Sequence, residues 1–170
     1  MAVSHVLVPT DFSEAATHAL RYAFEEAGVH RAKVTLLHVV PPGTGTDVYY
    51  VRPDAGQPGA FDPAVSARVG APWPAQPATV VRHDGSDVVL TQLRDLIPHE
   101  FRNTWSTELV VGSPAETIVR IAQEQAADLI VMGTHGRTGL KHALLGSVAE
   151  KVVRLAPCPV LTVRQASRTA

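Results

Sequence analysis

The chain has 170 residues, of which 45% are hydrophobic and 18% charged, and its 15 basic and 16 acidic residues give a formal net charge of -1. This length is sufficient for one ordinary hydrophobic core, so we expect a single globular domain over residues 1–166 and a short tail at 167–170. The near-neutral charge excludes a general electrostatic attraction to nucleic acid or anionic lipid, and any binding must come from specific sites.

The N-terminal segment predicts a strand, a helix and a second strand. The run HVLVP at 5–9 is short and β-rich, and apolar side chains recur at helical spacing within 11–28. Gly28 is a typical helix stop. The run KVTLLHVV at 33–40 is nearly all apolar, which is typical of a strand covered on both faces. Together these segments predict a βαβ unit.

The middle of the chain has a different composition. Residues 41–85 hold 8 of the 13 prolines and 6 of the 12 glycines. This composition predicts a long surface excursion without regular elements, followed by a short helix within 86–97 that ends before Pro98. A functional lid, a loop that contacts a partner or a second copy, and a tolerated insertion are all compatible with the excursion.

The C-terminal part again alternates strands and helices. We expect strands at 107–112, 128–133 and 159–163, and helices at 113–127 and 147–156. Ser113, Pro114 and Glu116 form the pattern of an N-cap, a first helical residue and a capping box. The alternation predicts an α/β fold, an open Rossmann-like parallel sheet with helices on both faces.

A glycine-rich loop follows the predicted strand at 128–133. Open parallel sheets bind ligands at the carboxyl ends of their strands, and Gly133 and Gly136 allow the backbone to approach an anion closely there. Ser147 and Glu150 form a second capping-box pattern, so the next helix directs its unpaired amides at the same space. Arg137 adds a cationic group. The loop therefore predicts a phosphate site, although a plain connection between strand and helix has similar glycines.

The spacing of this loop resembles a family signature. Neither G-x-x-x-x-G-K-[ST] nor G-x-G-x-x-G after the first strand is present, which disfavours a P-loop ATPase and an ordinary dehydrogenase. The loop instead matches G-x2-G-x9-G-[ST] through Gly133, Gly136, Gly146 and Ser147. This pattern resembles the ATP-binding signature of the universal stress protein family. VLVPTDFS, LLHV, VVGSPAETIVRIAQEQAADLIVMGTHGRTGL and GSVAEKVVRLAPCPVLTV also look like that family.

The resemblance covers roughly residues 3–40 and 107–164 and implies a five-stranded parallel sheet in the order 3-2-1-4-5. It also implies an ATP site, with Mg²⁺ bridging phosphate oxygens, and a homodimer through the last strand. The implied contacts are the nucleoside for Asp11, the adenine edge for the Val39 backbone, and the phosphates for Gly133, Gly136, Gly146 and Ser147, with the Val148 amide and Arg137 as further candidates. Read without the family, Asp11 caps the first helix together with Ser13.

The leading functional hypothesis is an ATP-binding regulator of a stress response or signal, in which ATP biases a conformational or dimer equilibrium that an unknown partner protein reads. No general base is evident, so we expect slow hydrolysis at most. The alternatives are an enzyme of nucleotidyl transfer or ATP-pyrophosphatase type, and a partner-binding module without nucleotide.

Other residues predict no further site. The eight histidines show no metal-binding spacing, and we expect His38 to be a hydrogen-bonded core residue. Cys158 is the only cysteine, no segment resembles a secretion signal, and no apolar run approaches the roughly 20 residues of a membrane span. These features predict a cytoplasmic protein.

Overall fold

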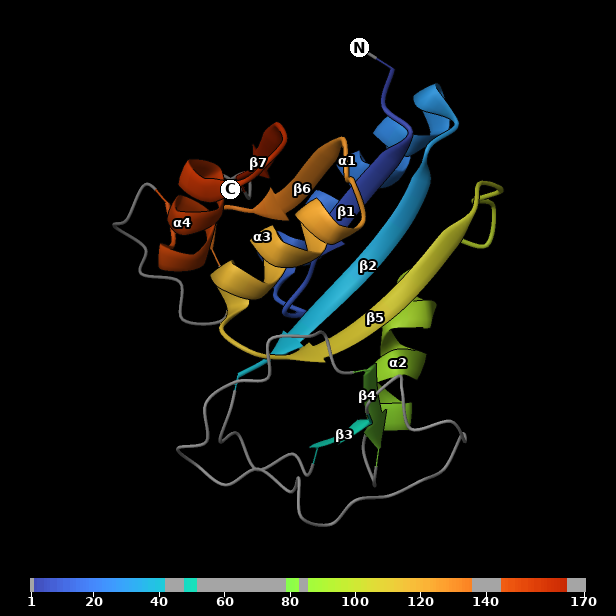
Figure 1. Cartoon of the computed structure of the whole chain (residues 1–170). Helices are drawn as coiled ribbons and strands as arrows, with labels where there is room; N and C mark the ends of the chain where they lie inside the picture. Colours follow the sequence, from blue (N-terminus) through green and yellow to red (C-terminus); the bar gives the residue numbers. More distant parts are fainter. Residues whose placement is uncertain (1, 42–47, 52–78, 83–85, 136–144, 165–170) are drawn as a thin grey trace, which may run out of the picture.

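The central element is a five-stranded parallel sheet (Figure 1). The computed structural model describes residues 2–41, 48–51, 79–82, 86–135 and 145–164. The strands of the sheet are β1 (His5–Pro9), β2 (Lys33–Val40), β5 (Trp105–Val111), β6 (Leu129–Gly133) and β7 (Val160–Val163). They lie in the order β5-β2-β1-β6-β7, and every neighbouring pair is parallel. Counted along the chain within this sheet, the order is 3-2-1-4-5, which confirms the predicted topology.

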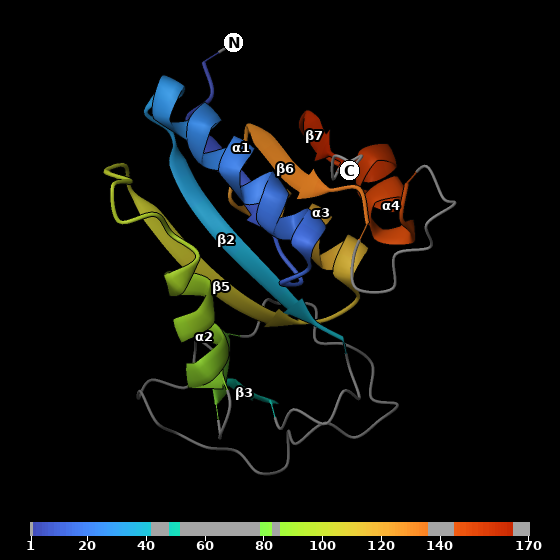
Figure 2. The ribbon, with the colours of Figure 1, turned by 180° about the vertical axis from the view of Figure 1, so that it is seen from behind.

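Helices cover both faces of the sheet, as predicted. α1 (Glu14–His30) and α2 (Ser86–Asp95) lie on one face, and α3 (Pro114–Glu124) and α4 (Ser147–Leu155) lie on the other (Figures 1 and 2). Side chains of β1 alternate between two hydrophobic clusters: Val6 and Val8 pack with α1 and α2, whereas Leu7 packs with α3 and α4. This burial on both faces explains why the strand sequences are apolar runs rather than alternating patterns.

α1 ends later than the sequence predicts. Gly28 lies inside the helix, which continues to His30 and ends where Arg31 adopts a left-handed conformation with φ 56° and ψ 33°. The amide of Ala32 donates to the carbonyl of Ala27 at 2.9 Å, and the amide of Arg31 donates to that of Gly28 at 3.4 Å. These two bonds form a Schellman motif. The prediction was wrong because the motif fixes the stop here with an arginine in place of the usual glycine.

The start of α3 differs in one detail from the predicted capping box. Ser113 is the N-cap and Pro114 is the first helical residue, but the Ser113 side chain makes no capping hydrogen bond. The Ser113 side chain is exposed, so water competes for its hydroxyl. Gly112 allows the chain to approach the first turn of α3 closely, because a Cβ atom there would overlap Oγ1 of Thr117. The second half of the predicted box, the Ser113 side-chain bond, is therefore absent.

The proline-rich middle contains regular structure that was not predicted. β3 (Val48–Val51) and β4 (Thr79–Arg82) pair antiparallel in a separate two-stranded sheet. Both strands are only four residues long, too short to give a periodic signal among many prolines, although valine and tyrosine favour strands. Most of the excursion at 41–85 and the predicted tail at 167–170 lie outside the described residues.

Candidate functional site

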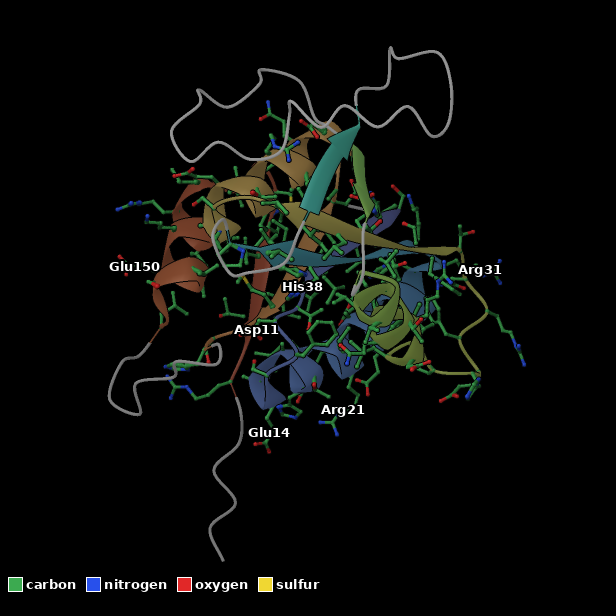
Figure 3. All side chains as sticks on the ribbon, turned by 90° about the horizontal axis from the view of Figure 1, so that it is seen from below. Asp11, Glu14, Arg21, Arg31, His38 and Glu150 are labelled. Atoms are coloured by element: carbon green, nitrogen blue, oxygen red, sulfur yellow. The ribbon has the colours of Figure 1, made fainter. Side chains whose placement is uncertain are left out.

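The carboxyl edge of the sheet contains the point where the chain reverses its winding direction. From β1 the chain runs to β2 and then β5 on one side, whereas β6 and β7 lie on the other side of β1. In open α/β sheets, ligands bind where neighbouring strands connect in opposite directions, here between β1 and β6. Figure 3 looks onto this edge, with Asp11 and His38 near its centre and Glu150 on α4 to one side.

The turn that follows β1 is held by its own side chains. Oγ1 of Thr10 accepts a hydrogen bond from the Phe12 amide at 3.1 Å, and Oδ1 of Asp11 accepts one from the Ser13 amide at 3.0 Å. Oγ of Ser13 then accepts from the Ala16 amide at 3.2 Å and caps α1. Ser13 therefore caps α1 as expected, whereas the Asp11 side chain holds the turn before the helix and does not bond a first-turn amide of α1 in these contacts. Asp11 is half-buried at this edge.

Phe12 adopts a strained backbone conformation within this turn. Its φ is 63°, in the left-handed region that aromatic residues rarely occupy, and such strain costs about 1–3 kcal/mol. His38 supports the turn from β2: its Nδ1 donates to the Thr10 carbonyl at 2.7 Å, and its ring lies 4.8 Å from the Phe12 ring. The expectation of a hydrogen-bonded His38 is confirmed, and its partner is the turn after β1.

The end of β2 extends beyond β1. The pairing of β2 with β1 ends at Leu37 opposite Pro9, whereas its pairing with β5 continues to Val40 opposite Val111. Val39 lies in this extension, and its side chain is buried in the cluster beneath α3 and α4. The strand therefore brings the Val39 backbone level with the Thr10–Ser13 turn.

Gly133 at the end of β6 allows a close backbone contact. A Cβ atom there would lie 2.8 Å from the carbonyl carbon of Ala15, 2.9 Å from its oxygen and 3.0 Å from the Ala16 nitrogen. These are backbone atoms of the first turn of α1, which cannot move away cheaply. The absence of a side chain at Gly133 thus has a packing role, which the sequence interpretation as a phosphate contact did not include.

α4 begins directly against the end of β6. The Gly146 amide donates to the Thr134 carbonyl at 2.7 Å, and a Cβ atom at Gly146 would lie 3.0 Å from the same oxygen. Gly146 is the N-cap and Ser147 the first helical residue, so the predicted capping box with Ser147 as N-cap is wrong by one position. A glycine N-cap has no side chain to pair the first-turn amides, which include that of the half-buried Val148.

These contacts bring several of the predicted site residues together. The first turn of α1, the end of β6 and the start of α4 form a continuous series of backbone contacts through Gly133, Thr134 and Gly146. Gly136 and Arg137 lie outside the described residues. Over the described ranges, no three side chains of His, Cys, Asp or Glu are grouped so that they could hold a metal ion.

A second polar cluster was not predicted from the sequence. The cluster extends from the amino end of the sheet, at His5, to the middle of β5, at Glu108. Hydrogen bonds of 2.5–3.3 Å connect its members, which are His5, Thr35, Ser106, Glu108 and Gln125. Burial lowers the pKa of the His5 imidazole below its usual value. The only signal in the sequence is a set of isolated polar residues inside otherwise apolar strands.

Of the helices in the described part of the chain, none is both long and apolar enough to cross a membrane.

Comparison with known proteins links the whole chain to one family. A profile described as the Universal stress protein family matches residues 3–164. A universal stress protein of Methanocaldococcus jannaschii is 33% identical over 160 residues, which is 94% of this chain and 81% of that protein. A universal stress protein of Thermus aquaticus is 33% identical over 159 residues, which is 94% of this chain and 97% of that protein.

Solved structures give the same result for the fold. Universal stress protein UspA from Lactobacillus plantarum superposes with a TM-score of 0.64 at 27% identity, covering 96% of this chain and 99% of that one. A universal stress protein in complex with cAMP has a TM-score of 0.63 at 22% identity over 98% and 100% of the two chains. One from Archaeoglobus fulgidus in complex with dAMP has a TM-score of 0.56 at 23% identity over 96% and 99%. At such identities these two complexes bear on the fold alone.

Proposed function

Because the chain belongs to the universal stress protein family, we propose that it binds an adenine nucleotide, ATP in particular, at the carboxyl edge of its sheet. The observation that carries this proposal is the junction of the Thr10–Ser13 turn, the end of β6 and the start of α4 at the point where the winding reverses. Two structural neighbours bind cAMP and dAMP, which are both adenine nucleotides.

The residues at this edge have the chemistry that such a ligand needs. The amino end of α4 supplies unpaired amides and the positive end of a helix dipole, both of which favour phosphate. Asp11 is a carboxylate of the kind that accepts hydrogen bonds from a ribose hydroxyl, and the Val39 backbone can pair with the edge of a base. Gly133, Gly136, Gly146 and Ser147 would contact the phosphates, with the Val148 amide and Arg137 as further candidates.

Magnesium would rely on the nucleotide rather than on a protein cage. Mg²⁺ usually keeps several waters and is held by substrate phosphates with one or two carboxylates. Asp11 is the carboxylate nearest the centre of this edge in Figure 3, with Glu14 and Glu150 farther out. The ion would neutralise phosphate charge there.

We assign the function to binding rather than to turnover. ATP would bias a conformational or dimer equilibrium that a regulatory protein partner reads, and hydrolysis would be slow at most. The proposed dimer forms through β7, which has β6 as its single neighbour in the sheet order and exposes Leu161. An open strand edge with an exposed apolar side chain pairs readily with its own copy. Sedimentation should therefore detect a dimer that Leu161→Lys weakens, and a strict monomer at micromolar concentration contradicts this part.

The nucleotide site can be tested with a matched pair of variants at Ser147. Ser147 is exposed in the first turn of α4, where Asp stabilises a helix but repels phosphate. We expect Ser147→Asp to fold normally and to lose Mg-ATP affinity about tenfold or more by titration calorimetry, which corresponds to about 1.4 kcal/mol. Ser147→Asn has nearly the same shape as Ser147→Asp without the charge, so it should bind Mg-ATP more tightly than Ser147→Asp.

The outcomes separate the proposed function from its alternatives. Equal ATP affinities of the two Ser147 variants would show that the phosphates do not bind near the start of α4. No binding of ATP to the native protein would overturn the proposal and leave a partner-binding module. Release of AMP and pyrophosphate in the presence of an acceptor would instead support a nucleotidyl-transfer enzyme.

A further inference from the structure

The polar cluster that joins His5 to Glu108 begins at a buried histidine at the amino end of the sheet. His5 in β1 is 7% exposed. Its Nδ1 lies 3.1 Å from the carbonyl oxygen of Gln125, and its Nε2 lies 2.8 Å from Oγ1 of Thr35, which is fully buried in β2. Both ring nitrogens are therefore within hydrogen-bond distance of a defined partner.

The chemistry of these partners fixes most hydrogen positions. A carbonyl oxygen only accepts, so Nδ1 of His5 carries a hydrogen and donates it to Gln125. In the neutral ring Nε2 then only accepts, and the Thr35 hydroxyl must donate to it. The Ser106 hydroxyl, 3.1 Å away, can donate to Thr35 Oγ1 in turn.

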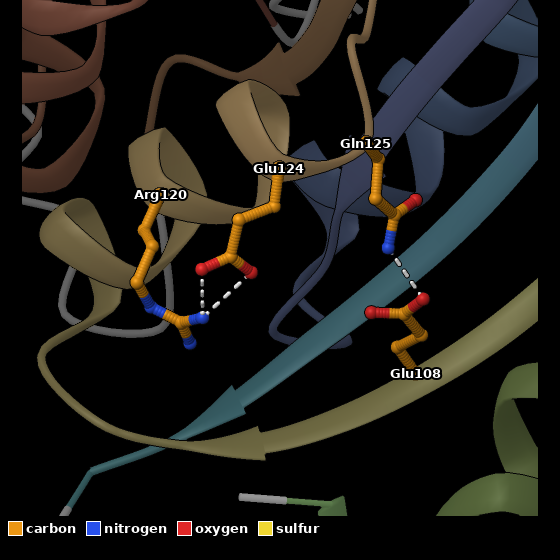
Figure 4. A network of polar contacts seen from close by, with 4 residues as sticks. All are labelled: Glu108, Arg120, Glu124 and Gln125. Carbon is orange, nitrogen blue, oxygen red and sulfur yellow. Dashed lines mark hydrogen bonds and ion pairs between the residues drawn. The ribbon is translucent and has the colours of Figure 1, made fainter. Parts of the chain in front are cut away.

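The same hydroxyl also faces a second acceptor. Thr35 Oγ1 lies 3.3 Å from Oε1 of Gln125. Figure 4 shows the other end of this amide, whose Nε2 donates to Oε1 of Glu108 at 2.5 Å. The Glu108 carboxylate only accepts, which fixes the orientation of the Gln125 amide with its oxygen toward Thr35. Thr35 has one hydroxyl hydrogen, so it can serve His5 or the Gln125 side chain but not both.

We propose that His5, Thr35, Gln125 and Glu108 form a proton-responsive relay across β1, β2 and β5. When a proton from solvent binds to Nε2 of His5, this nitrogen becomes a donor to Thr35 Oγ1. The Thr35 hydroxyl then turns to Oε1 of Gln125, and the three hydrogen bonds from Nε2 of His5 through Thr35 and Gln125 to Glu108 all run toward the carboxylate. No other proton leaves the cluster, so its net charge rises by one.

Burial and the charges around His5 set the pH at which this change occurs. Burial lowers the pKa of His5, and Lys33 on β2 acts in the same direction. The Gln125 carbonyl, the Asp128 carboxylate and the Glu108 carboxylate favour the charged ring. The relay therefore responds to acidification below the range of an exposed histidine.

The relay ends at the junction of α3 with the sheet. Gln125 is the C-cap of α3, and the opposite end of this helix begins at the carboxyl edge after Gly112. A change in the hydrogen bonds of Gln125 thus acts on the helix that spans the distance between the two edges. This inference does not depend on the proposed nucleotide site.

Nuclear magnetic resonance of the protein can follow both ends of the relay. We expect the imidazole ¹⁵N signals of His5, assigned by their loss in His5→Gln, to show the neutral Nδ1–H tautomer above neutral pH. On acidification, the side-chain amide signals of Gln125 should shift with the same midpoint as the His5 ring. Thr35→Val, which keeps the shape but removes the hydroxyl, should abolish the shift of Gln125, and Thr35→Ser should restore it.

Glu108→Gln controls for titration of the carboxylate itself. It should move the His5 transition to lower pH while the Gln125 signals continue to follow it. The relay would be overturned if the side-chain amide signals of Gln125 in the native protein did not shift at the His5 transition. This result would be decisive even if Thr35→Val failed to fold. Signals that still follow His5 in a folded Thr35→Val protein would also overturn it, because the hydroxyl is the proposed link.

Discussion

Gly133→Ala tests whether this glycine is required by packing. The added Cβ atom would lie 2.8–3.0 Å from three backbone atoms of Ala15 and Ala16, closer than ordinary van der Waals contact. β6 is paired on both sides, with β1 and β7, so it cannot shift away without disturbing two ladders. The first turn of α1 must therefore move, together with the Thr10–Ser13 turn that precedes it.

The expected cost follows from the usual effect of overpacking. Forcing one methyl group into a close-packed contact destabilises a protein by about 1–3 kcal/mol. For a chain of 170 residues, about 2–4 °C of Tm corresponds to 1 kcal/mol, so we expect Tm to fall by about 2–12 °C.

Gly28→Ala is the matched control for the same substitution. Gly28 is exposed in α1, and no atom lies within 4 Å of the position of its missing Cβ. Alanine there should raise the free energy of unfolding by about 0.5–1 kcal/mol, because glycine is a poor helix former. The two variants should thus change stability in opposite directions.

Equilibrium unfolding in urea, followed by far-UV circular dichroism, measures both changes. The packing argument is wrong if Gly133→Ala is as stable as the native protein while Gly28→Ala behaves as expected. If Gly133→Ala instead keeps its stability and loses nucleotide affinity, the glycine serves the ligand alone.

Three other predictions concern pH and the ends of α1. The pKa of His5 in the folded protein lies below its usual 6.5, so its contribution to the free energy of unfolding is fully present above about pH 6.5 and is lost as the pH falls through the folded pKa. One proton changes this free energy by at most about 1.4 kcal/mol per pH unit. His5→Gln should remove this slope, which urea unfolding at several pH values measures. An unchanged slope in His5→Gln would contradict this. The Asn103 side chain donates to the carbonyls of Ala27 and Ala32 at 2.8 and 3.2 Å. Asn103→Ala should therefore lower the free energy of unfolding by about 1–2 kcal/mol. An unchanged free energy of unfolding would mean that water replaces both hydrogen bonds. Arg31→Gly should raise it by about 0.5–1 kcal/mol by relieving the left-handed φ of 56°, and a loss of stability would show that the Arg31 side chain matters more than its backbone.

The successful sequence predictions share a local cause. Strands buried on both faces need continuous apolar runs, so residues 33–40 and 128–133 were recognisable as strands of a parallel sheet. The ends of elements were less predictable. Arg31 and Gly146 occupy cap positions because of backbone conformation and contacts, although the competing residues Gly28 and Ser147 have the better local propensities for such positions.

The sequence by itself determined the α/β class, the family and the expected edge of the site, because turn chemistry, apolar runs and motif spacing are local properties of the chain. Only the tertiary structure decided that Gly133 lies close to the backbone of α1 and that Gly146 packs on Thr134. It also decided that His5 meets Gln125, which lies 120 residues away. Such contacts depend on the register of strands and on the close approach of distant backbones, and these are fixed only when the sheet and its two helical layers pack together.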